Sequence, residues 1–355
     1  MYEGNLHLNG PNIAVAGVGG RGTGFLKTLA RTDDAGTAVA FADPHAPSRQ
    51  CAGRWAPDAT IHDDWRQMLS STPCDVLMIT APQYVHADMV VAALDRGIDV
   101  YCEKPMAHTL DDCDRIIAAV NASDALFYVG LQLRTVPVFK HVKQLIDDGA
   151  VGKPRTMFYR ELRGPFVPKV DNWIADESKS GGALVEKNVH HFDLFNWYCG
   201  GRAVRVHAIG GKALTAEQGG NVGQLIDHAF VLVDYDNDMR ACLQMCFFCP
   251  AWAHELEIIG DNGRRLVTDL EDLKLYDAES DTRRHDAWHF GIERAHGDPS
   301  GWLDFLERRE RGSTREDSRR QAELGRDSVA IAWAAQESIR TNQIVELMPG
   351  AQEYQ

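Results

Sequence analysis

The chain has 355 residues, of which 44% are hydrophobic and 25% are charged, and its formal net charge is −14 at pH 7. This length exceeds one ordinary hydrophobic core and predicts about two domains, and the composition is typical of a soluble globular protein. The acidic charge excludes the extended basic surface that a nucleic-acid partner needs. No run approaches the roughly 18 apolar residues of a membrane span, so we expect no membrane partner.

The first ten residues and the cysteines bear on the cellular compartment. The segment MYEGNLHLNG has no basic stretch followed by an apolar run, so we expect no secretory signal. The eight cysteines need not pair, which predicts a reducing, cytoplasmic location. Cys242, Cys246 and Cys249 have an iron–sulfur-like C-x3-C-x2-C spacing, but they lie in an apolar run that predicts a strand. We therefore expect core cysteines and no metal.

Strand and helix patterns alternate along the first 130 residues. Strands are expected at 11–17, 37–43, 75–82, 99–105 and 125–132, and helices at 23–32, 86–97 and 110–123. Strands separated by helices indicate right-handed βαβ units and a parallel sheet. The sequence therefore predicts an α/β Rossmann domain with a doubly wound parallel sheet over residues 1–130.

The pattern changes in residues 131–355, where longer runs alternate between apolar and polar residues. These runs lie at 155–163, 205–214, 228–236, 240–248 and 254–260. They predict an α+β domain with a large, mainly antiparallel, open-faced sheet. The free face of such a sheet suits self-association, so we expect a homo-oligomer, a dimer or a tetramer. The charge-dense segment 305–326 predicts a solvated loop and the start of a helix.

A glycine motif, G-x-G-x-x-G, lies between the first strand and the first helix. Gly17 permits the tight turn, Gly19 lets the backbone approach a pyrophosphate, and Gly22 packs the helix on the strand. Gly20 and Arg21 complete the loop, and the helix N-terminus attracts an anion. The strand–loop–helix context gives the motif its meaning and predicts dinucleotide binding.

An acidic residue ends the second strand, about 20 residues after the glycine motif. This residue, Asp43, is placed to accept hydrogen bonds from the two ribose hydroxyls and to repel a 2′-phosphate, so NAD is predicted over NADP. Arg49 lies nearby and would favour the phosphate instead. FAD is a further alternative, although no flavin signature accompanies the motif.

Residues 181–193, GGALVEKNVHHFD, concentrate ionisable side chains in an otherwise apolar stretch. In an α-helix Glu186, His190 and Asp193 share one stripe, and Lys187 and His191 form a second. Buried ionisable groups need partners or a function. Acid/base and substrate-binding machinery is the favoured interpretation. A zinc site would need a third ligand from elsewhere, and histidines satisfied by a carboxylate are the remaining alternative.

Five segments together resemble the Gfo/Idh/MocA oxidoreductases, the relatives of glucose–fructose oxidoreductase and inositol dehydrogenase. They are TAPQYVH at 80–86, EKP at 103–105, GLQLR at 130–134, IDDGAVGKP at 146–154 and GGALVEKNVHHFD. The resemblance runs from about residue 12 to about residue 270 with the motifs in order. It implies an NAD cofactor, with Pro82, His86 and Glu103 among the cofactor-binding residues.

The resemblance also implies catalytic roles for Lys104 and His190. Lys104 would point at the substrate hydroxyl, and His190 matches the histidine of the family's D-x-G-x-H-x-x-D segment. Oxidising a carbinol needs a base for the hydroxyl proton, and an ammonium group stabilises developing alkoxide charge. Glu186 stands where many members have aspartate and is expected to contribute to acid/base chemistry. The expected substrate-binding residues are Arg134, Lys169, Trp173, Lys187, His191 and Asp193.

Three functions are compatible with these residues. The favoured one is an NAD-dependent dehydrogenase acting on a secondary hydroxyl of a sugar, polyol or sugar derivative, with an anionic substrate suggested by the extra cations. The second is an NAD-dependent glycosidase, acting for example on sulfosugar or uronate glycosides, which oxidises, eliminates, adds water and returns the hydride. The third is a non-catalytic NAD-binding regulator, which would need neither Lys104 nor His190.

Overall fold

The computed structural model describes residues 10–220, 223–277, 285–290 and 300–347. The chain divides into two compact units. The first comprises Met1–Leu131 and His296–Arg326, and the second comprises Gln132–Ala295 and Asp327–Gln355.

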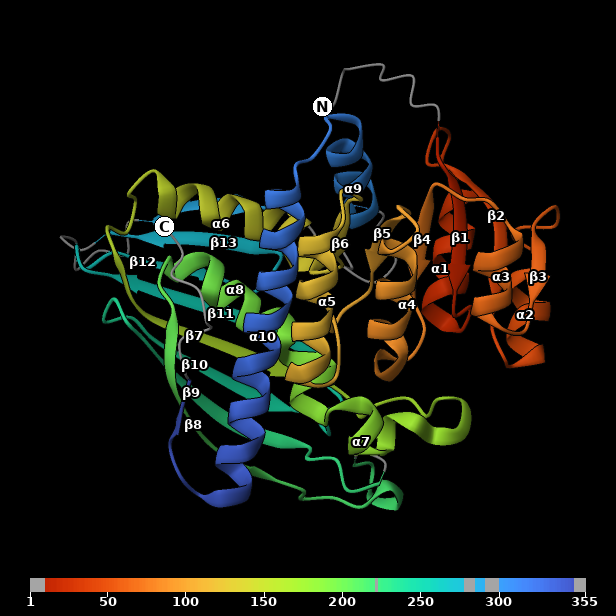
Figure 1. Ribbon diagram of the computed structural model, residues 1–355. Coiled ribbons are helices and arrows are strands. Elements are labelled where there is room, and N and C mark those ends of the chain that lie inside the picture. The colour runs from red at the N-terminus through yellow and green to blue at the C-terminus, as the bar shows by residue number, and fades with distance from the viewer. Residues whose placement is uncertain (1–9, 221–222, 278–284, 291–299, 348–355) are drawn as a thin grey trace. The chain divides into compact units, whose positions relative to one another are not determined.

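The first unit contains a six-stranded parallel sheet (Figure 1). Its strands are β1 (Asn12–Ala16), β2 (Thr37–Ala42), β3 (Thr60–His62), β4 (Val76–Ile79), β5 (Asp99–Cys102) and β6 (Phe127–Val129). The strand order β3-β2-β1-β4-β5-β6 reverses direction between β1 and β4. Because parallel crossovers are right-handed, this reversal sends the two sets of connecting helices to opposite faces. The predicted doubly wound Rossmann sheet is confirmed, and its switch point lies between β1 and β4.

Short helices connect these strands. They are α1 (Gly20–Leu29), α2 (Ala46–Ala52), α3 (Trp65–Ser71), the 3₁₀ turn η1 (Gln83–Val85), α4 (His86–Leu94) and α5 (Leu110–Ala122). Strands β1 and β4 are apolar and almost wholly buried, as expected for strands covered on both faces. The sequence patterns missed α2, β3 and α3, which are too short to show a clear period.

Residues 300–326, which the sequence placed in the second domain, pack with the first unit. Helix α9 (Ser300–Glu310) inserts Trp302, whose Nε1 donates a hydrogen bond to the Ala35 carbonyl at 2.9 Å. Trp302 and Phe305 stack on each other and meet the ring of Tyr101 edge-on. The predicted solvated loop is wrong for residues 305–310, which continue α9 and bury Phe305 and Leu306, whereas the predicted helix start within 305–326 is confirmed by α10, which begins at Arg315.

The second unit contains a nine-stranded sheet in the order β14-β13-β12-β11-β7-β10-β9-β8-β15. The strands are β7 (Pro154–Leu162), β8 (Ala203–Gly211), β9 (His228–Tyr235), β10 (Arg240–Cys246), β11 (Ala253–Gly260), β12 (Arg265–Thr268), β13 (Asp272–Tyr276), β14 (His285–His289) and β15 (Val345–Glu346). The neighbouring pair β7 and β10 runs parallel, and the other neighbouring pairs run antiparallel. The predicted mainly antiparallel sheet is confirmed. The expectation of core cysteines is wrong, because Cys242 and Cys246 lie on the half-buried face of β10 and Cys249, also half-buried, lies beyond its end.

Helices α6 (Pro137–Asp147) and α8 (Val189–Cys199) of the second unit lie over one face of this sheet (Figure 1). The unit also contains the short helical segments η2 (Gln132–Thr135), η3 (Val170–Ala175), α7 (Glu177–Ser180), η4 (Leu184–Asn188) and η5 (Ala216–Gln218). Helix α10 (Arg315–Thr341) begins in the first unit and continues into the second. Among the described residues, no helix is both long enough and apolar enough to cross a bilayer.

The polar stretch 181–193 departs from the predicted α-helix. Residues Leu184–Asn188 form a π-helical turn, η4, and the α-helix starts at Val189. The wider turn means that Glu186 and His190 are not related by the α-helical spacing, so the predicted single stripe is wrong at that end. Gly182 has φ +86°, and a Cβ there would overlap Gln336 of α10. A close contact with α10 therefore fixes the start of this turn.

Candidate functional site

The glycine loop follows β1 at the switch point of the parallel sheet. Gly17 has φ +87°, and a Cβ there would overlap Ala81; a Cβ at Gly22 would overlap the Gly17 carbonyl. Gly19 and Gly20 instead face open space, since a Cβ at either position would have no atom within 4 Å. Two of the glycines are thus required by the fold, and two leave room for a ligand.

This open side of the loop suits the pyrophosphate of a dinucleotide. Helix α1 starts at Gly20 with Gly19 at its N-cap, and its first turn carries no acidic side chain. The backbone N–H groups of a first helical turn point out of the helix and favour an anion. The cradle at Gly19 and Gly20 is one that a Cβ would fill. The residues present therefore fit a bound dinucleotide.

Asp43 lies where the ribose of the dinucleotide is expected. Its two carboxylate oxygens accept hydrogen bonds from the Val18 and His45 backbone N–H groups, at 2.9 and 2.8 Å. Each oxygen keeps a further lone pair for a ribose hydroxyl. Arg49 donates to the Asp43 and Pro44 carbonyls, at 2.6 and 3.0 Å. Because the Arg49 guanidinium group hydrogen-bonds the backbone of this turn, its presence near Asp43 is explained without a 2′-phosphate.

Glu103 links the glycine-loop helix to the turn that carries Lys104. Arg21 Nε donates to Glu103 Oε1 at 2.8 Å, and the Lys104 backbone N–H donates to Oε2 at 3.2 Å. The Glu103 side chain is almost fully buried. Arg21 and Glu103, predicted to bind the cofactor, are therefore brought together as an ion pair that positions the Lys104 turn.

His86 joins the turns that follow β4 and β5. Its ring nitrogens lie 2.8 Å from the Ala81 carbonyl oxygen and 3.1 Å from the Pro105 carbonyl oxygen. Burial lowers the pKa of His86, although both carbonyls oppose that shift. Pro82 lies at the N-cap of η1, directly before this region. These contacts hold the residue after Lys104 against the end of β4.

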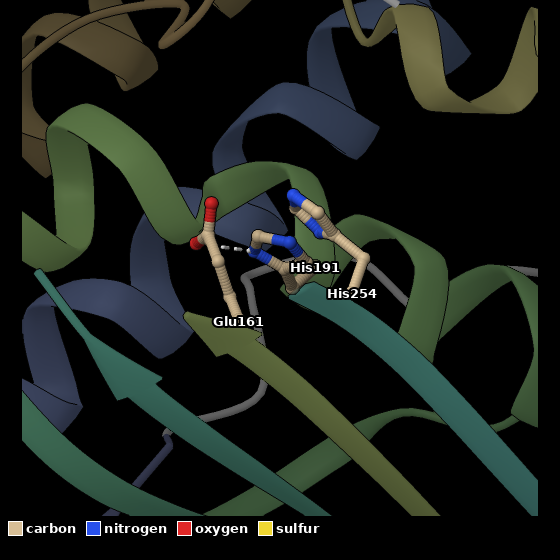
Figure 2. Close-up of side chains that lie close together, drawn as sticks. All are labelled: Glu161, His191 and His254. Atoms are coloured by element: carbon tan, nitrogen blue, oxygen red, sulfur yellow. Dashed lines mark ion pairs between the residues drawn. The ribbon is translucent and has the colours of Figure 1, made fainter. Parts of the chain in front are cut away.

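A second group of polar side chains lies in the second unit. Glu161 of β7, His191 of α8 and His254 of β11, here called the Glu161 cluster, have ligand atoms within 4.8 Å of one another. Glu161 and His254 are directly opposite each other in the antiparallel pair β7–β11. Figure 2 shows both rising from neighbouring strands toward the helix that carries His191. This group can hold a metal ion.

The Glu161 carboxylate is fully buried and surrounded by nitrogen atoms. Lys187 Nζ lies 3.1 Å from Oε1, Asn188 Nδ2 donates to Oε2 at 3.0 Å, and His191 Nδ1 is 3.8 Å from Oε2. Burial alone would raise the pKa of Glu161, but the charges of Lys187, His191, His254 and Arg163 outweigh it and lower the pKa to about 2. Glu161 is therefore an anion at neutral pH.

Arg134 and Asp193, both predicted to bind substrate, bind each other. Arg134 donates through Nε and Nη2 to the two Asp193 oxygens at 2.8 and 2.7 Å. Burial of Asp193 raises its pKa, and the guanidinium limits that rise. Arg134 also lies over the Trp197 ring, 5.1 Å from its centroid. The pair ties η2 to α8.

The other predicted site residues of this unit lie on two segments. His190 is 5% exposed on α8, and Glu186 is half-buried in the π-turn η4. Lys169 is exposed at the start of η3, and Trp173 is half-buried within it. His191 and Lys187 join Glu161, as described above.

Sequence reasoning missed Glu161 and His254 because they lie far from the motif in the chain. The signal was nevertheless present in the strand pattern. Along β7 the buried side chains alternate as Met157, Tyr159 and Glu161, so a carboxylate occupies an inward-facing position. His254 shares its face with Leu256 in the same way. Polar residues in phase with a buried apolar face identify such sites.

Comparison with known proteins assigns both parts of the chain to one family. Residues 11–131 match the oxidoreductase family with an NAD-binding Rossmann fold, and residues 139–265 match the Gfo/Idh/MocA C-terminal domain. The chain belongs to the Gfo/Idh/MocA family of oxidoreductases. The predicted family and the predicted NAD cofactor are confirmed.

Individual relatives cover different shares of the chain. Inositol 2-dehydrogenase of Salmonella paratyphi B is 31% identical over 185 residues, 52% of this chain and 53% of that protein. The 2,7-anhydro-N-acetylneuraminate hydratase of Mediterraneibacter gnavus is 26% identical over 189 residues, 53% of this chain and 49% of that protein. The chain thus spans about half the length of these curated relatives.

Solved structures extend the similarity across nearly the whole chain. A levoglucosan dehydrogenase in complex with NADH and levoglucosan aligns with a TM-score of 0.80 and 19% identity, over 94% of this chain and 98% of that one. At this identity the alignment establishes the shared fold.

Proposed function

We propose that this protein is an NAD-dependent dehydrogenase that oxidises a secondary hydroxyl of a sugar, polyol or sugar derivative. The observation that carries this proposal is the open cradle at Gly19 and Gly20, which shares the carboxyl edge of one parallel sheet with Lys104. Two relatives support the substrate class, since their names specify inositol and levoglucosan as substrates.

In the proposed reaction, NAD held at the Gly19 and Gly20 cradle would supply the acceptor for the hydride of the carbinol carbon. Lys104 holds the hydroxyl oxygen and stabilises its developing negative charge, and Glu103 with His86 keeps the Lys104 turn in place. His190 removes the hydroxyl proton, because an unprotonated imidazole nitrogen can act as a general base. Glu186 assists this proton transfer. Lys169 and Trp173 bind the substrate, and the exposed Lys169 ammonium group favours a substrate with a carboxylate or a sulfonate. Lys187, predicted from the sequence to bind substrate, instead pairs with Glu161.

A substrate panel tests this proposal. Purified protein with NAD is offered inositols, neutral aldoses, uronates and sulfosugars, and reduced nicotinamide is followed by its absorbance. We expect NADH to accumulate with at least one class, and we expect a Lys104→Met variant to bind NAD while losing turnover. Full activity of that variant would exclude the role assigned to Lys104.

An NAD-dependent glycosidase is the second candidate. The named hydratase relative acts on an anhydro-sugar acid and so favours chemistry that adds water to a carbohydrate. Oxidation of a sugar hydroxyl to a ketone would acidify the neighbouring C–H bond. Loss of that proton would allow the aglycone to be eliminated, and water would then add. Return of the hydride from NADH would complete the cleavage of the glycoside without net NADH. Solvent deuterium incorporated into the released sugar supports this route, and cleavage without incorporation excludes it.

A further inference from the structure

We propose that Glu161, His191 and His254 form a binding site for a divalent transition-metal ion such as Zn²⁺. Two imidazole nitrogens and one carboxylate oxygen are a ligand set that zinc commonly takes in proteins, and three protein ligands leave a position open for water or another oxygen ligand. The site goes beyond the proposed function, because neither the NAD cradle nor the proposed roles of Lys104 and His190 require it.

Backbone geometry brings the three ligands together. Cross-strand neighbours such as Glu161 and His254 have Cβ atoms about 4.5–5.5 Å apart, and α8 supplies His191 from above the sheet. Figure 2 shows the three side chains meeting between the strands and the helix. Metal–ligand bonds of about 2.0–2.2 Å separate the ligands of a tetrahedral ion by roughly 3.4 Å. Since the ligand atoms lie within 4.8 Å of one another, side-chain shifts of about an ångström complete the site.

Neighbouring side chains contact the ligand rings and fix their orientation. The Tyr159 hydroxyl lies 3.0 Å from His254 Nδ1, and such a contact leaves Nε2 of that ring for an ion. The Tyr159 ring packs against the His191 ring with centroids 4.4 Å apart. Tyr159, which faces inward from β7 as Glu161 does, therefore contacts both imidazole rings.

Asn188 supplies an independent observation. Its Nδ2 lies 3.0 Å from Glu161 Oε2 and 3.1 Å from His191 Nδ1, while its Oδ1 is buried with no hydrogen-bond partner among the described residues. Turning the amide over places that oxygen beside both ligands, where a cation held between them would satisfy it. A buried acceptor beside a carboxylate and an imidazole needs a donor or a cation.

Lys187 sets the limit on metal affinity. Its ammonium nitrogen lies 3.1 Å from Glu161 Oε1 and competes for the same negative charge, whereas Oε2 faces His191. A divalent ion bound at Oε2 would be repelled by this ammonium group. Removing the Lys187 charge should therefore tighten metal binding, an effect that a purely structural hydrogen-bond network would not produce.

The test is a metal titration of the full-length, tag-free protein after treatment with a chelator. Co²⁺ is titrated while its visible absorption bands are recorded, and Zn²⁺ affinity is measured by competition with a chromophoric indicator. We expect one ion per chain, about 100-fold weaker affinity in His254→Gln and Glu161→Gln, and about tenfold tighter affinity in Lys187→Met. His289→Gln is the control. His289 also lies beside a carboxylate, that of Asp272, but it is outside the Glu161 cluster.

Each sample is also titrated with NAD and checked by circular dichroism. Retained NAD binding in a variant that has lost Co²⁺ binding supports the metal site and separates it from a folding defect. The proposal is overturned if wild-type protein binds neither Co²⁺ nor Zn²⁺. It is also overturned if the His254→Gln and His289→Gln variants bind the ion with equal affinity. Either result leaves the dehydrogenase proposal untouched. Unchanged or weaker affinity in Lys187→Met contradicts the role given to that ammonium group.

Discussion

The glycine loop takes its ligand-binding groups from residues 17–22, whereas the Glu161 cluster gathers its groups from β7, α8 and β11. The loop offers backbone groups to the ligand. The fold itself requires glycine at positions 17 and 22, whereas the absence of a side chain at Gly19 leaves room for the ligand. The cluster works through side chains that strand pairing brings together. A site built from one continuous turn is visible in the sequence. For a site assembled by strand register, the sequence shows single inward-facing polar residues, and only the fold shows which of them meet.

Among the residues that continuous motifs identify, Lys104 is the one whose substitution should lower activity most. The Lys104→Met variant removes the ammonium group while leaving the Glu103 contact to the backbone N–H intact. We expect kcat/KM for the best substrate to fall by about 10³-fold with NAD affinity unchanged. Steady-state kinetics and an NAD titration check this. A parallel loss of NAD affinity would mean that the lysine acts on the cofactor site instead.

Arg134 tests the second unit by stability. Arg134→Met leaves the buried Asp193 carboxylate without its bidentate partner and should lower the free energy of unfolding by about 3 kcal/mol. The double variant Arg134→Met/Asp193→Leu should recover much of that loss, because no uncompensated charge remains. Denaturant unfolding measures both. An equal loss in the two variants would show that packing, not charge pairing, stabilises this contact.

A matched pair of glycine variants sharpens the contrast within the loop. Gly19→Ala should fold normally and bind NAD about 10- to 100-fold more weakly, because its methyl group enters the open cradle and displaces charge-assisted hydrogen bonds. Gly22→Ala should instead lose thermal stability, since its methyl group overlaps the Gly17 carbonyl. Calorimetry and thermal melts distinguish them. Normal NAD affinity in Gly19→Ala would place the pyrophosphate elsewhere.

Asp43 predicts a smaller effect on cofactor choice. Asp43→Asn keeps an acceptor for one backbone N–H group but removes the charge that repels a 2′-phosphate. We expect the preference for NAD over NADP to fall by about tenfold. Comparing Kd values for the two cofactors checks this. An unchanged preference would assign the discrimination to another residue.

The outer face of the large sheet is where we expect the predicted self-association. Ile209 and Phe230 are directly opposite each other on β8 and β9 and are 67% and 52% exposed. Exposed apolar side chains that gather on one face are typical of an interface. Ile209→Asp/Phe230→Asp should shift sedimentation toward the monomer without changing NAD affinity. Sedimentation identical to wild type would exclude this face.

Sequence alone predicted the parts of the fold in which period and motif agree. The strands around the glycine loop are continuous and apolar, and the strands of the second unit alternate, so both sheets were predictable. The π-turn at residues 184–188 was not, because a single wider turn leaves no periodic trace. Helix α9 was hidden because its charged face masks Trp302 and Phe305.

The candidate site, like the fold, was predictable where continuous motifs define it. Gly19, Asp43 and Lys104 follow parallel strands at their carboxyl ends, where ligands bind, so their positions followed from the motifs. The pairing of Arg134 with Asp193 was not predictable, since both were expected to bind substrate. Glu161 and His254 were missed because their proximity depends on the β7–β11 register.

The most direct test of hydride transfer to NAD follows a deuterium label on the carbinol carbon of the best substrate. We expect the label in the reduced nicotinamide, one equivalent for each substrate consumed, together with a primary isotope effect. Label returned to the sugar with NAD needed only in catalytic amount would establish the glycosidase route instead. Substrate consumed with no label passing through the nicotinamide would contradict NAD-dependent chemistry altogether.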